Sequence, residues 1–285
     1  MIVLTIALQK GGTAKTTTAQ ALGEGLAREG FKVLFIDLDT QGNLSTILGA
    51  KPSARSSYEV LRGQIPITEA IQRTERGDIV ATSPKLSLLE GELTGPGRCY
   101  RLQEALGELS GYDFIIIDTP PASGVIVDNS LTASNGVIVP VQPDIFSYQG
   151  LKILESTIHQ AQRYNNPGLE ILGVLVTRWN ARAVLNQQIL ETFEEEARKI
   201  GTVVYETKIR ECITIKEAQA SRTSIYDYPR TNASKDYRAF VKEVMAQLHA
   251  PSKAKKRSSK RGGTEEKIED EPGRNRGENR AINHG

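Results

Sequence analysis

The sequence has 285 residues, of which 39% are hydrophobic and 25% charged, and its formal net charge is +2. This composition is typical of a soluble globular protein, and its apolar runs fall far short of the roughly 20 residues that a membrane helix requires. Cys99 and Cys212 are the only cysteines. They are too few and too far apart for a disulfide framework or a metal motif, so they fit a reducing cytoplasm.

Strand-length apolar runs alternate with helical patterns over most of the chain. The alternation predicts strand–helix–strand units, which force parallel pairing and right-handed crossovers. We therefore expect an α/β fold, with a doubly wound, mostly parallel sheet flanked by helices, in one domain over residues 1–250. The strands are expected near 2–8, 33–37, 78–82, 113–118, 136–141, 170–177 and 202–205. The helices are expected near 15–29, 56–62, 66–73, 100–110, 125–133, 149–163, 183–199 and 234–249.

The first expected strand is followed by Lys10-Gly-Gly-Thr-Ala-Lys-Thr-Thr17, which opens the first expected helix. A strand that turns through glycines into a helix N-terminus aims several backbone N–H groups at one point, where the helix dipole also favours an anion. This arrangement predicts a nucleotide-phosphate site. Lys15 would supply charge for the β- and γ-phosphates, and the Thr16 hydroxyl is placed to ligate Mg²⁺. Ala14 stands where the strict motif has glycine, and its Cβ would strain a loop that needs a positive φ.

Two later strand runs end in aspartates. The run near 33–37 ends in Asp37, and Asp39, two residues later, leaves the same face of the strand. The run near 113–118 ends in Asp118, which is the usual Walker-B arrangement, with a carboxylate that holds Mg²⁺ directly or through water. Because ligands gather at the carboxyl ends of parallel strands, we expect Lys15, Asp39 and Asp118 to meet in one active site.

The last expected helix, 234–249, is amphipathic. Ser234 is a suitable N-cap, and Lys235, Arg238 and Lys242 stand opposite a stripe of apolar residues at helical spacing. We interpret this segment as a final helix that packs on the sheet. The alternative is that the apolar stripe binds an anionic membrane surface.

Residues 251–285 differ in composition from the rest of the chain. They contain no aromatic residue, few aliphatic residues, and ten Lys or Arg against six Asp or Glu. Such a segment cannot bury enough apolar surface to offset the entropy of ordering it, so we expect a disordered, charged tail. The tail carries a net charge of +4, which leaves −2 on residues 1–250.

Three segments together resemble the ParA/Soj-type partition ATPases, which are relatives of MinD. Lys10–Thr17 resembles their deviant Walker A box, Asp37–Asn43 their Walker A′ segment, and Ile117–Pro121 their switch region. The likeness extends over residues 1–245. It implies a P-loop NTPase fold of the deviant Walker A type, with ATP and Mg²⁺ as ligands and ATP hydrolysis as the reaction. No N-K-x-D guanine-reading motif occurs in the sequence, which also favours ATP.

The resemblance assigns roles to individual residues. Lys10 would be the signature lysine, which reaches across a nucleotide-sandwiched dimer to the partner's phosphates, while Asp39 would position the attacking water. It therefore predicts Lys10, Lys15 and Asp39 as catalytic residues and Thr16, Asp39 and Asp118 as the Mg²⁺ site. The predicted nucleotide-binding residues are Lys10, Gly11, Gly12, Thr13, Ala14, Lys15, Thr16, Thr17, Thr177, Arg178, Lys208 and Arg210.

Any affinity for DNA must come from a local patch or from the tail, because residues 1–250 are not basic overall. The resemblance aligns Arg182 with an arginine that family members use for non-specific DNA contact. At a second such position the chain has Thr214, for which Lys216 or Arg210 would substitute. The predicted DNA-binding residues are Arg182, Lys216 and Arg222, and contacts of this kind would be salt-sensitive and carry no base information.

The resemblance implies a cytoplasmic, nucleoid-associated ATPase that segregates a plasmid, chromosome or mobile element. ATP would sandwich a homodimer, the dimer would bind DNA non-specifically, and a ParB-like centromere-binding partner would trigger hydrolysis and release. Two alternatives stay open. One is a MinD-like membrane-cycling ATPase, supported by the helix near 234–249. The other is a nucleotide-gated binding protein with little turnover, suggested by Ala14 and by Thr40, which replaces the family's usual proline.

Overall fold

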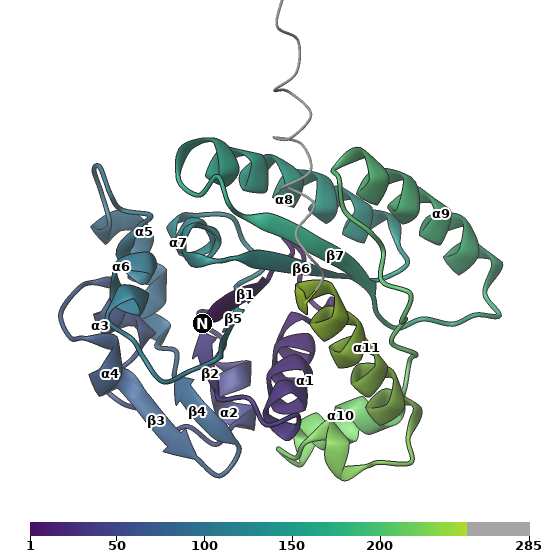
Figure 1. Cartoon of the computed structure of the whole chain (residues 1–285), viewed down its shortest axis with the longest axis horizontal. Helices are drawn as coiled ribbons and strands as arrows, with labels where there is room; N and C mark the ends of the chain where they lie inside the picture. Colours follow the sequence, from purple (N-terminus) through teal and green to yellow (C-terminus); the bar gives the residue numbers. More distant parts are fainter. Residues whose placement is uncertain (250–285) are drawn as a thin grey trace, which may run out of the picture. The chain divides into compact units, whose positions relative to one another are not determined.

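A seven-stranded sheet lies at the centre of the structure (Figure 1). This computed structural model describes residues 1–249, and the disordered tail expected over 251–285 lies outside the described residues. The strand order is β3-β4-β2-β5-β1-β6-β7, and all pairs are parallel except the antiparallel edge pair β3–β4. The predicted doubly wound, mostly parallel sheet is therefore confirmed. The strands are β1 (Ile2–Ile6), β2 (Val33–Asp37), β3 (Ile71–Thr74), β4 (Gly77–Val80), β5 (Phe114–Asp118), β6 (Gly136–Val141) and β7 (Glu170–Val176).

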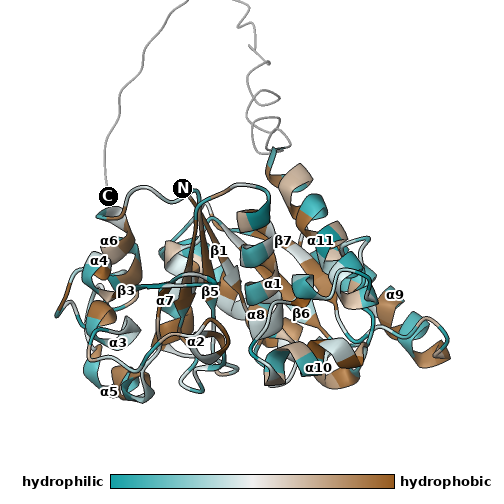
Figure 2. Cartoon of the chain, turned by 90° about the horizontal axis from the view of Figure 1, so that it is seen from below, coloured by the Kyte–Doolittle hydropathy of each residue, from teal (hydrophilic) through white to brown (hydrophobic). Residues whose placement is uncertain are grey.

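Helices cover both faces of the sheet (Figure 1). One face packs against α1 (Lys15–Arg28) and α11 (Asn232–His249), and the other packs against the helices from α3 to α9. Figure 2 shows mostly hydrophobic strands at the centre, surrounded by helices that carry both hydrophobic and hydrophilic residues. The remaining helical elements are α2 (Asn43–Ile47), α3 (Ser57–Leu61), α4 (Ile67–Ala70), η1 (Pro84–Leu88), α5 (Leu89–Glu92), α6 (Arg101–Gly107), α7 (Val125–Ala133), α8 (Ile145–Tyr164), α9 (Val184–Lys199), α10 (Ile213–Ala220) and η2 (Ile225–Asp227).

The register of the central strands aligns their carboxyl ends. Asp118 at the end of β5 pairs with Ile6 at the end of β1 and with Asp37 at the end of β2. β1 lies between β5 and β6, so strands β2 to β5 lie on one side of β1 and strands β6 and β7 lie on the other. In open α/β sheets, ligands bind in the crevice at such a switch point.

The helix predicted over 66–73 is wrong in its second half. α4 ends at Ala70, and Ile71 begins β3, which pairs antiparallel with β4. The reversal between the strands is closed by Gly77, whose φ of 132° lies in a region that only glycine adopts easily. Residues 71–73, for which the apolar spacing predicts helix, therefore belong to the edge hairpin.

The strand predicted over 202–205 is also wrong, because no regular strand forms there. Val204 forms only an isolated parallel bridge to Val174. Tyr205 then turns its ring into the core against Phe240, with the ring centroids 5.1 Å apart. Two short helices next to the cavity described below, α2 and α10, were not predicted, because neither spans enough residues to show a clear apolar period.

The apolar stripe of α11 is buried. Tyr237, Phe240 and Val244 are fully buried within the same hydrophobic cluster as Leu22 and Leu26 of α1. This confirms a final helix packed on the body of the protein and removes the observation that supported the membrane-cycling alternative. Among residues 1–249, no helix has both the length and the apolar character needed to cross a membrane.

We expect Phe240→Ala to lower the free energy of unfolding by about 3–5 kcal/mol, because it removes a fully buried ring and leaves a cavity. Leu185→Ala is the control: Leu185 is 61% exposed, so its truncation should change stability by less than about 0.5 kcal/mol. Equilibrium unfolding in urea measures both. Equal effects of the two substitutions would contradict the packing of α11.

Candidate active site

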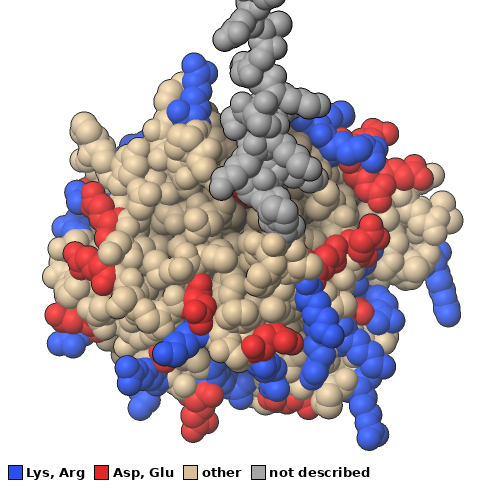
Figure 3. Space-filling view, viewed as in Figure 1, with Lys and Arg blue, Asp and Glu red and all other residues tan. Residues whose placement is uncertain are grey.

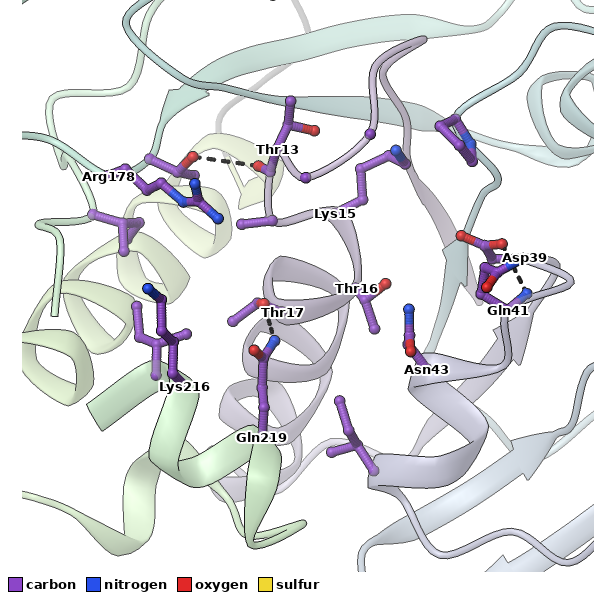
Figure 4. Close-up of a pocket in the computed structure, with 18 of the residues that line it drawn as sticks. Thr13, Lys15, Thr16, Thr17, Asp39, Gln41, Asn43, Arg178, Lys216 and Gln219 are labelled. Carbon is purple, nitrogen blue, oxygen red and sulfur yellow. Dashed lines mark hydrogen bonds between the residues drawn. The ribbon is translucent and has the colours of Figure 1, made fainter. Parts of the chain in front are cut away.

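The loop between β1 and α1 wraps the start of the helix and opens onto a cavity of about 520 Å³ (Figure 4). Gly12 and Ala14 adopt left-handed conformations, with φ of 77° and 69°, and Ala14 is the N-cap of α1. The Lys15 side chain is buried, and its Nζ donates a hydrogen bond of 2.9 Å to the Lys10 carbonyl. The loop thus has the form of a phosphate loop, and Ala14 occupies the strained backbone position that its sequence suggested.

Segments far apart in the sequence line this cavity. The phosphate loop provides the middle of the lining, the β2–α2 connection provides one side, and α10 with the segment after β7 provides the other. The lining residues are Gly11, Gly12, Thr13, Ala14, Lys15, Thr16, Thr17, Asp39, Gln41, Asn43, Thr46, Ile47, Pro121, Thr177, Arg178, Ile209, Glu211, Cys212, Ile215, Lys216, Gln219 and Tyr237.

The two aspartates of the second strand have different surroundings. Asp37 is completely buried and accepts hydrogen bonds from the Ser45 hydroxyl at 2.7 Å, the Ser45 N–H at 2.8 Å and the Asp39 N–H at 3.1 Å. Burial raises its pKa to about 6, although these hydrogen bonds oppose the rise. Asp39 lines the cavity and accepts a hydrogen bond from the Gln41 N–H. Asp37 therefore fixes the loop that presents Asp39.

Asp118 is buried beside Asp37, and neither of its carboxylate oxygens accepts a hydrogen bond from the described residues. Burial, and next the Asp37 carboxylate, raise the pKa of Asp118 well above its usual value, while Thr16 and Lys15 oppose the rise. Buried polar atoms are rarely left without partners. Two unpartnered carboxylate oxygens near the Thr16 hydroxyl fit a hard cation such as Mg²⁺, which prefers oxygen ligands and favours the ionised carboxylate.

Burial also affects Lys15. It lowers the pKa of the ammonium, while the carboxylates of Asp118 and Asp39 act in the opposite direction. A buried cation is stabilised only by opposite charges nearby. Lys15, Asp39 and Asp118 therefore belong to one electrostatic cluster at the carboxyl edge of the sheet.

Lys10 does not line the cavity. Its Nζ contacts both oxygens of Asp144 at 2.6 Å and the Ser147 hydroxyl at 3.2 Å, at the start of α8. For Asp144, burial alone would raise the pKa, but the hydrogen bonds from Lys10 and Ser147 outweigh it, and the pKa is lowered. The Lys10 side chain is thus directed to the start of α8 and away from the cavity.

The predicted nucleotide-binding residues outside the phosphate loop fall into two groups. Thr177 and Arg178 line the cavity, and the Thr177 hydroxyl contacts the Thr13 carbonyl at 3.3 Å. Lys208 and Arg210 do not line it. Lys208 donates to the Glu206 carbonyl, and Arg210 forms a two-pronged ion pair with Asp236 of α11. The structure therefore directs these two side chains elsewhere.

Sequence reasoning missed several lining residues. Gln41 lies in the loop after β2 and Asn43 begins α2. Both lie within the segment already recognised, so their closeness in sequence to Asp39 was a usable signal. Glu211, Cys212 and Gln219 come from a region that the family resemblance covers, but in which no phosphate-loop or aspartate-ended strand pattern marks these three residues. Among the residues predicted to bind DNA, Arg182 and Arg222 are exposed and lie outside the cavity, whereas Lys216 lines it.

A phosphate loop and two strand-end aspartates at one edge of a parallel sheet define a P-loop nucleotide-binding protein. The family model described as AAA domain matches residues 1–171. Chromosome partitioning protein ParA from Caulobacter vibrioides is 36% identical over 253 residues, which cover 86% of this chain and 94% of that protein. Chromosome-partitioning ATPase Soj from Thermus thermophilus is 34% identical over 247 residues, covering 86% and 96%. The chain belongs to the ParA/Soj family of partition ATPases, as its three motifs predicted.

A solved structure from Mycobacterium smegmatis shares the fold. It is described as cobyrinic acid a,c-diamide synthase with bound ATP analogue and magnesium. Its TM-score is 0.75 at 32% sequence identity, and the match covers 88% of this chain and 96% of that one. The likeness confirms the P-loop fold class.

We expect Ala14→Gly to raise the free energy of unfolding by about 0.5–1 kcal/mol, because glycine adopts the left-handed conformation of Ala14 without a steric penalty. Ala239→Gly is the control at an exposed position in the interior of α11, where glycine should lower stability by about 1 kcal/mol. Urea unfolding distinguishes them. A loss of stability in both variants would show that the loop is not strained at Ala14.

Proposed function

We propose that this protein is an ATP-dependent partition ATPase that segregates a replicon or mobile element, with residues 1–250 as its ATPase domain and 251–285 as a charged tail. The observation that carries the proposal is the convergence of the family's motifs on one cavity. Lys15, Thr16 and Asp39 line it, and Asp118 lies beside them with two oxygens that accept no hydrogen bond from residues 1–249. The M. smegmatis structure holds an ATP analogue and magnesium, which supports the same ligands here.

In this proposal, each residue of the site has a defined task. Lys15 and the N–H groups of the phosphate loop bind the β- and γ-phosphates, and Asp39 positions the attacking water. Thr16, Asp39 and Asp118 hold Mg²⁺, which neutralises charge on the phosphates when bound. Lys10 exchanges Asp144 for the phosphates of a second protomer, so that ATP joins two copies of the chain.

The ATP-bound dimer then binds DNA without sequence preference and acts in the cytoplasm on the nucleoid. A ParB-like protein at a centromere-like site stimulates hydrolysis and release. Arg182 and Arg222 are exposed, as phosphate contacts must be. Figure 3 shows Lys and Arg side chains gathered over α10 and α11, with acidic side chains between them. Exposed cations on α11 include Lys235, Arg238 and Lys242.

A direct test measures phosphate release and co-sedimentation of the purified protein with DNA or with anionic lipid vesicles, each with and without ATP. We expect ATP-dependent binding to DNA and none to vesicles. Lys15→Ala is the negative control and should lose ATP binding, because it removes the buried charge that faces the phosphates. ATP-dependent binding to vesicles instead of DNA would refute the proposal.

The left-handed backbone at Ala14 favours a second candidate, a nucleotide-gated binding protein with little turnover. Strain in the phosphate loop can disturb the geometry of hydrolysis more than it disturbs binding. Single-turnover hydrolysis separates the two candidates. An ATPase hydrolyses the ATP that it has bound, whereas a binding protein with little turnover leaves most of the bound ATP intact.

We expect Asp39→Ala to retain ATP binding and ATP-dependent dimerisation while hydrolysis falls below detection. The reason is position: Asp39 faces the cavity, whereas Asp37 makes the hydrogen bonds that hold the loop. Analytical ultracentrifugation with ATP and phosphate-release measurements test this side by side. A monomeric Asp39→Ala protein would mean that Asp39 is a structural residue.

For DNA, we expect Arg182→Ala to weaken ATP-dependent binding without changing the ATPase activity measured without DNA. Truncation after Ala250 should also weaken binding, but with steep salt dependence and no dependence on nucleotide, because it removes a segment of net charge +4. Salt titrations of DNA affinity with and without ATP separate the two effects. Loss of all ATP dependence on truncation, with normal binding by Arg182→Ala, would assign DNA binding to the tail.

A further inference from the structure

One wall of the cavity is formed by α10, although no motif marks this helix in the sequence. Cys212, its N-cap, lines the cavity together with Ile215, Lys216 and Gln219. These positions recur every three to four residues and so lie on one face of the helix. Ile213 points away and is 71% exposed. The wall therefore presents one cation and one amide to whatever fills the cavity.

Gln219 is tied to the first turn of α1. Its Nε2 donates a hydrogen bond of 2.7 Å to the Thr17 hydroxyl oxygen (Figure 4). Thr17 lines the cavity, and its hydroxyl donates to no group among the described residues. A hydroxyl has one proton and two lone pairs. Because Gln219 occupies a lone pair, the Thr17 proton remains available for an acceptor in the cavity, and a phosphate oxygen is such an acceptor.

Lys216 adds a positive charge to the same side of the cavity. Within residues 1–249, its ammonium forms no ion pair and no side-chain hydrogen bond, and the same is true of the Arg178 guanidinium. Figure 4 shows Lys216 pointing from α10 towards Arg178 and the phosphate loop. Both cations lie on the Thr17 side of Thr16, and Asp39 and Gln41 lie on the opposite side.

We propose that α10 is a nucleotide clamp, in which Gln219 orients the Thr17 hydroxyl as a donor and Lys216 supplies a cation. Lys15 takes the β- and γ-phosphates, and Asp39 marks the side where the γ-phosphate reacts. The part of the ligand next to Thr17 and Lys216 is then the α-phosphate and ribose of a nucleoside di- or triphosphate. Lys216 accordingly contacts nucleotide and not DNA. The inference rests on the proposed nucleotide function and adds two residues to its site.

The Gln219 series tests the direction of the hydrogen bond, with equilibrium binding of a fluorescent ATP analogue as the readout. Gln219→Leu should weaken binding about three- to tenfold, the range for one lost hydrogen bond. Gln219→Glu should bind more weakly still. A carboxylate only accepts, so Thr17 would donate to it and turn its proton away from the cavity, and the new charge would repel phosphate. Gln188→Glu adds the same charge on the exposed surface of α9 and should bind as the wild type does.

A purely structural role for Gln219 predicts the opposite order, because glutamate preserves the shape of glutamine better than leucine does. Binding by Gln219→Glu that equals the wild type or exceeds Gln219→Leu would therefore overturn the role of Gln219. Thermal unfolding verifies that each variant is folded. Should the Gln219 variants not fold, Lys216→Met tests the clamp by itself, since Lys216 is exposed.

Lys216→Met should weaken binding of the ATP and ADP analogues by the same factor, about tenfold for a charge-assisted contact. At saturating ATP it should bind DNA as the wild type does. Lys235→Met, an exposed lysine of α11 outside the cavity, is the control and should leave nucleotide affinity unchanged. Unchanged nucleotide affinity in Lys216→Met, or loss of DNA binding at saturating ATP, would contradict the nucleotide role of Lys216 and assign this residue to DNA binding. A wild-type protein that binds no ATP would instead refute the proposed function itself.

Discussion

The in-register pairing of β1, β5 and β2 is the constraint on which the site depends. It places Ile6, Asp118 and Asp37 at one level of the sheet, so that the phosphate loop and both aspartate segments start from the same edge. A shift of one residue in either pair would turn a carboxylate to the opposite face of the sheet. The hydrophobic residues beneath, buried on both faces of every central strand, hold this register in place.

The register also brings the buried carboxylates of Asp37 and Asp118 close together, where they repel each other. The surroundings of the two carboxylates differ. Asp37 receives the hydrogen bonds of Ser45 and Asp39 and becomes part of the framework. Asp118 receives none from the described residues, although it is equally buried. The buried ammonium of Lys15 offsets part of their charge. A divalent cation would complete the balance, which gives a physical reason for nucleotide and metal to bind together.

Two lysines outside this cluster have different positions relative to the cavity. Lys10 is paired with Asp144, and the two side chains are 21% and 34% exposed. In the proposed dimer, Lys10 would exchange this carboxylate for the phosphates of the second copy. Lys216 approaches from α10 on the side away from Asp39. The cavity is thus lined by segments far apart in the chain, and Thr17 and Gln219, which are joined by a hydrogen bond, are 202 residues apart.

The sequence by itself determined the phosphate loop, the two aspartate-ended strands and the family, because each depends on a local pattern of apolar residues, glycines and carboxylates. It also predicted the last helix, but the structure decided that the apolar stripe of this helix is buried against the body of the protein. The sequence also located the strain at Ala14. Only the tertiary structure decided which long side chains meet. It paired Lys10 with Asp144 and Arg210 with Asp236, turned Lys216 into the cavity, and joined Gln219 to Thr17. Such side chains can reach many partners, and the partner they contact depends on the packing of elements that lie far apart in the chain.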